Sequence, residues 1–131
     1  MTNHHSFLDK AYDFLNPLIY RLNVVYEKIC DLDISITSFP KDFGFDENYT
    51  FRSSSSDVFF LDRCLSQLSV SGNDCFLDIG CGKGKVLNLV LKYNLARIDG
   101  IEIVNEISKI ADENFSKIKN SRVKIFNIDA R

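Results

Sequence analysis

The chain has 131 residues, of which 45% are hydrophobic and 26% are charged, and its formal net charge is −2. These values are typical of one ordinary soluble globular domain, and the interspersed charges argue against nucleic-acid binding through bulk positive charge. No apolar run is long enough to span a bilayer. The N-terminus lacks the basic start and apolar stretch of a secretory signal, so we expect a cytoplasmic protein with no membrane partner.

Residues 6–31 are predicted to be helical, because apolar residues recur there at helical spacing. Pro17 interrupts this pattern and could divide the helix into two pieces. The following segment, residues 34–49, has no clear period and is interpreted as an irregular loop. Four serines at 53–56 and Asp57 then predict the start of another helix, since Ser54 and Asp57 have the spacing of a capping box.

The apolar face of this second helix would contain Phe60, Leu61, Cys64, Leu65 and Leu68, and a turn at residues 71–74 would end it. From there strands and helices alternate. Strands are predicted over about 75–78, 97–103 and 123–128, and helices over about 85–93 and 105–119. Such alternation predicts an α/β fold with parallel strands and right-handed crossovers.

Four cysteines lie at positions 30, 64, 75 and 81, without any Cys-x-x-Cys pair. A tetrahedral metal site usually contains such a pair, so no metal is predicted. Cys30, Cys64 and Cys75 have apolar neighbours and are expected to be small buried side chains with reduced thiols.

The first strand ends in Asp78, and glycines follow at alternate positions, Gly80, Gly82 and Gly84. Glycine allows a tight turn and the close approach of a ligand. Glu102 comes 24 positions after Asp78, at the tip of the second strand, where folds of this kind place a residue that binds a ribose. The third glycine comes one residue too early for a dinucleotide fingerprint, and Gly-Lys-Ser/Thr, the end of a phosphate-binding loop, is absent.

The pattern Asp78-x-Gly80-x-Gly82-x-Gly84 resembles the first motif of class I S-adenosylmethionine-dependent methyltransferases. Glu102 after the second strand, Asp129 after the third and Asn114 in the intervening helix continue the resemblance. It covers roughly residues 50–131. We therefore expect a Rossmann-like α/β domain at 50–131, with a helical and irregular N-terminal extension at 1–49.

The resemblance implies S-adenosylmethionine as the cofactor and gives each motif residue a role. The backbone around Gly80, Cys81 and Gly82 would contact the methionine part, with Asp78 near its ammonium, and Gly84 would also belong to the cofactor-binding residues. Glu102 would accept both ribose hydroxyls, Ile103 would lie on the adenine face, Asp129 would accept from the adenine amino group, and the Ala130 amide would donate to a ring nitrogen. Residues 52–56 could fold over the methionine end, whereas Lys83 and Lys85 are expected to be solvated.

A complete fold of this class has seven strands, and the present sequence reaches only the third. The motif of the fourth strand, which lines the acceptor pocket in the family, has no counterpart here. The catalytic residues and the methyl acceptor (a small molecule, protein or RNA) therefore stay unassigned. The first strand would also become a sheet edge, so we expect self-association through it, coverage by the N-terminal helices, or marginal stability.

Two other functions compete with an S-adenosylmethionine-dependent methyltransferase. One is a non-catalytic remnant or regulatory module that keeps the cofactor-binding half of the fold. The other is a dehydrogenase-like nucleotide binder, which the glycine spacing disfavours.

Overall fold

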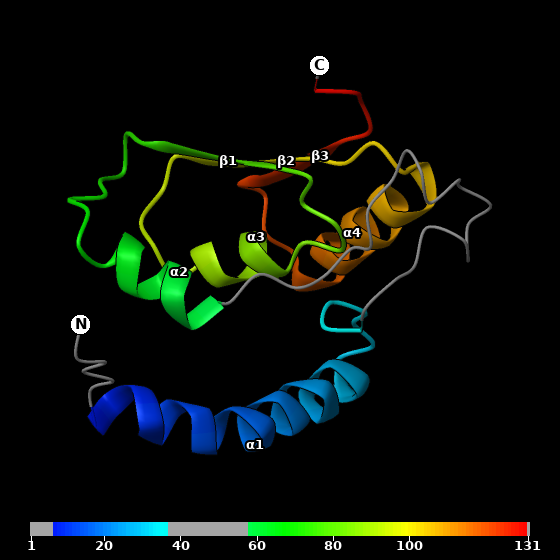
Figure 1. The fold of residues 1–131 in the computed structure, drawn as a ribbon. Coiled ribbons are helices and arrows are strands. Elements are labelled where there is room, and N and C mark those ends of the chain that lie inside the picture. Colours follow the sequence, from blue (N-terminus) through cyan, green and yellow to red (C-terminus); the bar gives the residue numbers. More distant parts are fainter. Residues whose placement is uncertain (1–6, 37–57, 131) are drawn as a thin grey trace.

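The computed structural model describes residues 7–36 and 58–130 (Figure 1). Within these ranges three parallel strands form one sheet in the order β1-β2-β3. The elements are α1 (Phe7–Ile29), α2 (Val58–Leu65), β1 (Cys75–Ile79), α3 (Lys85–Val90), β2 (Arg97–Ile101), α4 (Asn105–Ile118) and β3 (Val123–Phe126). The predicted Rossmann-like α/β fold is confirmed, with α1 as the predicted N-terminal helical extension.

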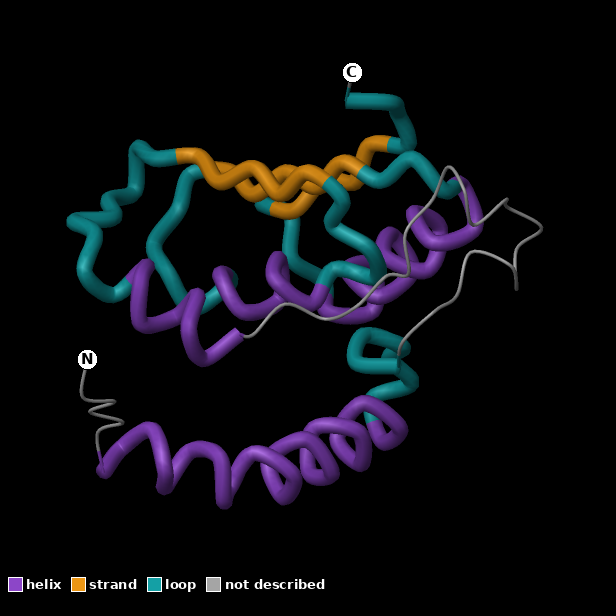
Figure 2. Tube along the Cα trace, in the orientation of Figure 1, coloured by secondary structure: helices purple, strands orange, loops and turns teal. Residues whose placement is uncertain are grey.

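Helices α2, α3 and α4 lie on one face of the sheet, and α1 lies beyond them on the same side (Figures 1 and 2). The core forms between this face and the helices. Its fully buried side chains include Leu87 and Val90 of α3 and Ile98 of β2, and Phe115 of α4 is 5% exposed. Helix α4 contributes Ile107, Ala111 and Phe115 to the buried side chains.

Gly100 in β2 allows α3 and the bend before it to approach the sheet closely. A Cβ at this position would lie 2.7 Å from both Cys81 Sγ and Leu87 Cδ1. A strand glycine at such a position marks a close approach that a side chain would prevent.

The opposite face of the sheet is open among the described residues. Leu77 and Ile79 of β1 are 53% and 65% exposed, and Phe126 of β3 is 41% exposed. Among the residues that the structure describes, strand β1 is also an edge of the sheet and pairs only with β2. Helix α1 leaves both surfaces uncovered, because it lies on the helical side of the molecule (Figure 1).

Two helices differ from their predicted bounds. Helix α1 continues through Pro17 as a single helix, so the expected break is absent. Helix α3 ends at Val90 instead of near Tyr93. Beyond this end, the Arg122 guanidinium binds backbone carbonyls that a longer helix would have satisfied. It donates to the carbonyls of Leu91 (2.8 Å) and Tyr93 (3.0 Å), so these groups are satisfied without another helical turn.

The prediction that three cysteines are buried is wrong for two of them. Cys64 and Cys75 are exposed, and Cys30 is half-buried. Cys75 faces the open side of the sheet, which sequence spacing could not reveal. No cluster of three or more metal-binding side chains and no helix able to cross a membrane occurs in the described residues. Residues 37–49 of the loop predicted at 34–49, and the serine helix start at 53–57, lie outside them.

Replacing Gly100 with alanine is expected to lower the free energy of unfolding by about 1–3 kcal/mol, because the new methyl group overlaps Cys81 and Leu87. Urea unfolding of both proteins measures the effect. Gly72→Ala is the matched control, since its Cβ would meet only the flexible Asn94 amide, at 3.1 Å. Equal stability of the Gly100→Ala variant and the parent would contradict the close packing of α3 on β2.

Candidate functional site

The glycine bend, residues 80–84, joins β1 to α3. Its three glycines have positive φ values of 79°, 54° and 91°, which side chains rarely tolerate. The Gly80 and Cys81 amides both donate to the Ile101 carbonyl, at 2.8 and 2.9 Å. The bend is therefore tied to the end of β2. At Gly84 a Cβ would overlap the Phe115 ring, so α4 also requires a glycine there.

Glu102 lies directly against the glycine bend. Its Oε2 accepts from the Gly82 amide at 3.0 Å, and its Oε1 accepts from the Val104 amide at 2.9 Å. The residue is 7% exposed. Each carboxylate oxygen has two acceptor sites, so one on each remains for another donor. The predicted meeting of the bend and this acid is present, with the carboxylate held in a fixed orientation.

Asp78 lies at the end of β1, next to this carboxylate. Burial raises the pKa of Asp78 above its ordinary value of 3.8, and the negative charge of Glu102 raises it further. Its side chain has no hydrogen-bond partner among the described residues. A Cβ at the adjacent Gly80 would meet nothing within 4 Å, so the backbone faces open space there. Two carboxylates beside an open backbone surface form a site suited to a cation.

Cys81 has a structural place in this site. Its side chain is 6% exposed, and burial, followed by the charges of Asp78 and Glu102, raises the thiol pKa to about 12. The thiol is therefore protonated at neutral pH and is not a nucleophile.

The segment after β2 contains Ile103, whose side chain is 50% exposed. The Asn127 amide fixes this segment by donating to the carbonyls of Glu102 (2.8 Å) and Ile103 (3.0 Å). Sequence reasoning missed Asn127, because nothing in its local pattern distinguishes it from a strand-end residue. Asp129 and Ala130 are exposed beyond the end of β3. Their adenine contacts stay predictions, and the segment 52–56 lies outside the described residues.

The expectation that Lys83 is solvated is wrong. Lys83 is 8% exposed, and its ammonium contacts both carboxylate oxygens of Asp33, at 2.8 and 2.7 Å. Asn114 of α4, which is 2% exposed, donates to the carbonyls of Lys83 (3.1 Å) and Asp33 (2.9 Å) and accepts from the Asp33 amide (2.9 Å). A segment 50 positions earlier in the chain therefore covers Lys83. Local sequence patterns carry no signal of such a distant partner.

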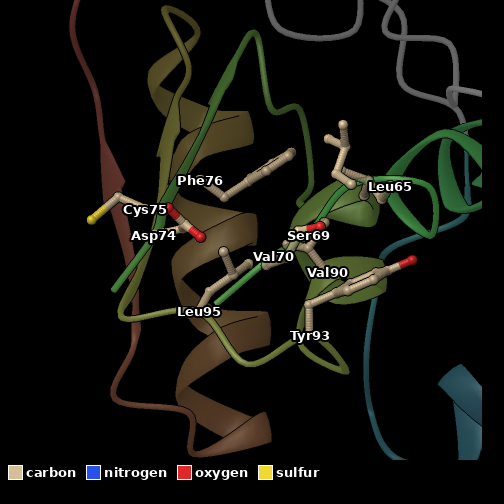
Figure 3. Close-up of a pocket in the computed structure, with 10 residues that line it drawn as sticks. Leu65, Ser69, Val70, Asp74, Cys75, Phe76, Val90, Tyr93 and Leu95 are labelled. Atoms are coloured by element: carbon tan, nitrogen blue, oxygen red, sulfur yellow. The ribbon is translucent and has the colours of Figure 1, made fainter. Parts of the chain in front are cut away.

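A cavity of about 340 Å³ lies at the opposite end of the strands from the glycine bend (Figure 3). It opens between α2, the start of β1 and the end of α3, where Leu65, Phe76, Val90 and Tyr93 line it. Its lining is mostly apolar, and it contains none of the residues predicted to bind the cofactor.

Three solved structures similar to this chain are named as methyltransferases. The putative methyltransferase YhhF from Escherichia coli has 23% identity and a TM-score of 0.51, and the match covers 60% of this chain and 43% of that one. The tRNA (m1A58) methyltransferase TrmI from Aquifex aeolicus has 26% identity and a TM-score of 0.48, with 66% and 34% covered. An RNA methyltransferase from Salinibacter ruber, solved with S-adenosylhomocysteine, has 23% identity and a TM-score of 0.48, with 57% and 50% covered.

The chain thus spans half or less of the length of these structures, and about a quarter of some others. The likeness to the Escherichia coli protein supports the fold. A comparison with curated proteins found no match.

The family described as "Histone methylation protein DOT1" matches residues 52–131, which is more than half of the chain. This family uses S-adenosylmethionine, so the cofactor expected from the glycine motif is confirmed at the level of the family. The matched range contains the glycine bend, Glu102 and Asp129. The chain belongs to the DOT1 family of S-adenosylmethionine-dependent methyltransferases.

Proposed function

We propose that this chain forms the part of an S-adenosylmethionine-dependent methyltransferase that binds the cofactor, at the glycine bend and the adjacent carboxylates. The contact between the Gly82 amide and the Glu102 carboxylate carries the proposal. This contact brings the end of β1 and the end of β2 to one point at the carboxyl edge of the parallel strands. Open α/β sheets bind their ligands at this edge.

The charges of the site match the charges of this cofactor. S-adenosylmethionine carries an ammonium and a sulfonium, and when bound it supplies an activated methyl group. Asp78 has a raised pKa and no partner among the described residues, so an ammonium would stabilise its ionised form. The oriented Glu102 carboxylate would accept from the two ribose hydroxyls with its remaining acceptor sites. Gly80 leaves room for the methionine part.

The proposal assigns a cofactor and a reaction class, and leaves the acceptor and the catalytic residues open. The family description names histones, and two of the similar structures are RNA methyltransferases. Methyl transfer requires mainly alignment of the acceptor with the cofactor and, for some acceptors, removal of a proton. Binding of the cofactor without turnover would favour the regulatory module over the enzyme.

S-adenosylhomocysteine is expected to bind the protein in isothermal titration calorimetry. Its 2′-deoxy analogue should bind about 10–100-fold more weakly, because it loses one hydrogen bond to the charged Glu102. In a Glu102→Gln variant, the difference in affinity between S-adenosylhomocysteine and its 2′-deoxy analogue should be much smaller. The comparison of ligands within each variant separates contact with the ribose from any general loosening of the bend.

Glu106→Gln is the matched control, since it removes the same charge from an exposed position in the first turn of α4. It should keep the full penalty for the deoxy analogue. A parent protein that binds both ligands equally would remove the ribose assignment, and one that binds neither would remove the proposed function.

Asp78→Asn is expected to have opposite effects on binding and on stability. The folded protein raises the pKa of Asp78, so its ionised form destabilises the fold at pH values above that pKa. The variant should therefore unfold at a higher temperature than the ligand-free parent at pH 7, and this advantage should fade as the pH falls toward 3.8. Its affinity for S-adenosylmethionine should nevertheless fall. Unchanged affinity would show that Asp78 does not face the ammonium.

We also propose that two copies of the chain associate through β1. The outer backbone groups of this edge strand can pair with a second β1, and Leu77 and Ile79 would lie at the junction.

Sedimentation velocity over a range of concentrations is expected to detect this self-association. Leu77→Lys should shift the protein toward the monomer, because a charge on the open edge disfavours strand pairing. Lys92→Ala, on an exposed residue just after α3, is the control and should leave the association unchanged. A parent that remains monomeric at every concentration would contradict the proposal.

A further inference from the structure

The segment that follows α1, here named the strap and comprising residues 31–35, lies against α4 (cyan in Figure 1). Two contacts fix its ends. Lys117 of α4 forms an ion pair with Asp31 at 2.9 Å, and the buried Glu27 carboxylate accepts from the Ser35 amide (3.0 Å) and hydroxyl (2.6 Å). Ile34 is 4% exposed. The strap is thus packed on the domain although it lies outside the range matched by the family.

Asp33, in the middle of the strap, contacts the glycine bend. Its carboxylate binds the Lys83 ammonium at 2.7 Å, and Lys83 lies between Gly82 and Gly84. The lysine side chain is 7% exposed and that of Asp33 is 42% exposed. A buried ammonium that lost this partner would be left without compensation, so the bend would have to rearrange to solvate it.

The bend therefore has three anchors. The end of β2 holds its first half through Ile101 and Glu102, α4 holds the Lys83 carbonyl through Asn114, and the strap holds the Lys83 ammonium through Asp33. Of these anchors, only the strap comes from the N-terminal region that precedes the nucleotide-binding fold. Asn114 joins two of them, because it binds the backbones of both Lys83 and Asp33.

We propose that Asp33 is a positioning residue for the cofactor site: through Lys83 it holds the glycine bend in the shape that binds the cofactor. The identity of the ligand in this inference rests on the proposed function. The effect of Asp33 on the shape of the bend rests on the contacts described above. Docking of the strap and cofactor binding then favour each other, since both stabilise the same shape of the bend. The N-terminal region thereby becomes part of the cofactor site without touching the ligand.

Asp33→Asn tests this inference directly. Calorimetry should show that its Kd for S-adenosylhomocysteine rises about tenfold or more. Asp31→Asn is the matched control, because it removes the same charge two residues away, from an exposed ion pair. Lys117 keeps its hydrogen bond to the Asp31 carbonyl at 2.6 Å, so the strap stays anchored and the Kd should stay within about twofold of the parent. Asp33→Glu should restore most of the affinity, since it returns a carboxylate to Lys83.

Amide hydrogen exchange of the ligand-free proteins provides the second readout. Asp33→Asn should speed exchange at Gly82, Lys83 and Gly84 more than in the core strand β2, whereas a general loss of stability would affect both. If Asp33→Asn fails to fold, Lys83→Met and the double variant replace it. The double variant should recover part of the affinity and of the exchange protection that either single variant loses, because no unpaired charge remains.

The outcomes separate the two proposals. A parent that binds S-adenosylhomocysteine and an Asp33→Asn variant that binds it equally well would overturn the role of Asp33 and leave the proposed function intact. A parent that does not bind would remove the proposed function, and hydrogen exchange would then decide the role of Asp33. Equal exchange at residues 82–84 in the Asp33→Asn and Asp31→Asn variants would overturn it.

Discussion

The site depends on one hydrogen bond, from the Gly82 amide to the Glu102 carboxylate. It joins the bend after β1 to the segment after β2, and it is possible because the two strands are parallel and end at the same edge. The Val104 amide holds the other carboxylate oxygen. The acid therefore orients the bend and keeps free acceptor sites, so one side chain would link the fold to the proposed cofactor site.

Positive φ values and tight packing explain why this bend needs glycine. Gly84 lies under Phe115, and Gly100 lies under Cys81, so neither position has room for a side chain. Gly80, in contrast, faces open space. Gly84 of the bend and Gly100 of β2 therefore serve the packing of the domain, whereas Gly80 would leave room for the proposed cofactor. The glycine motif would thus meet a structural and a binding requirement together.

The sequence predicted the order of strands and helices and the meeting of the glycine bend with Glu102, because both follow from local periodicity and from the geometry of parallel strands. The predictions were wrong where a contact with a residue distant in the sequence determines the local structure. Lys83 is buried by a segment 50 positions earlier, and Arg122, just before β3, binds the carbonyls that follow α3. Cys75 is exposed because its face of the sheet is open. The division between extension and domain near residue 50 stays a prediction.

The central claim is that the glycine bend and Glu102 form the surface that binds the cofactor. Backbone amide resonances of the protein, followed by NMR during titration with S-adenosylhomocysteine, test it most directly. We expect saturable shifts at Gly80, Gly82 and Val104, with the apolar cavity around Phe76 unaffected. Shifts confined to that cavity, or none at the three amides at saturation, would contradict it.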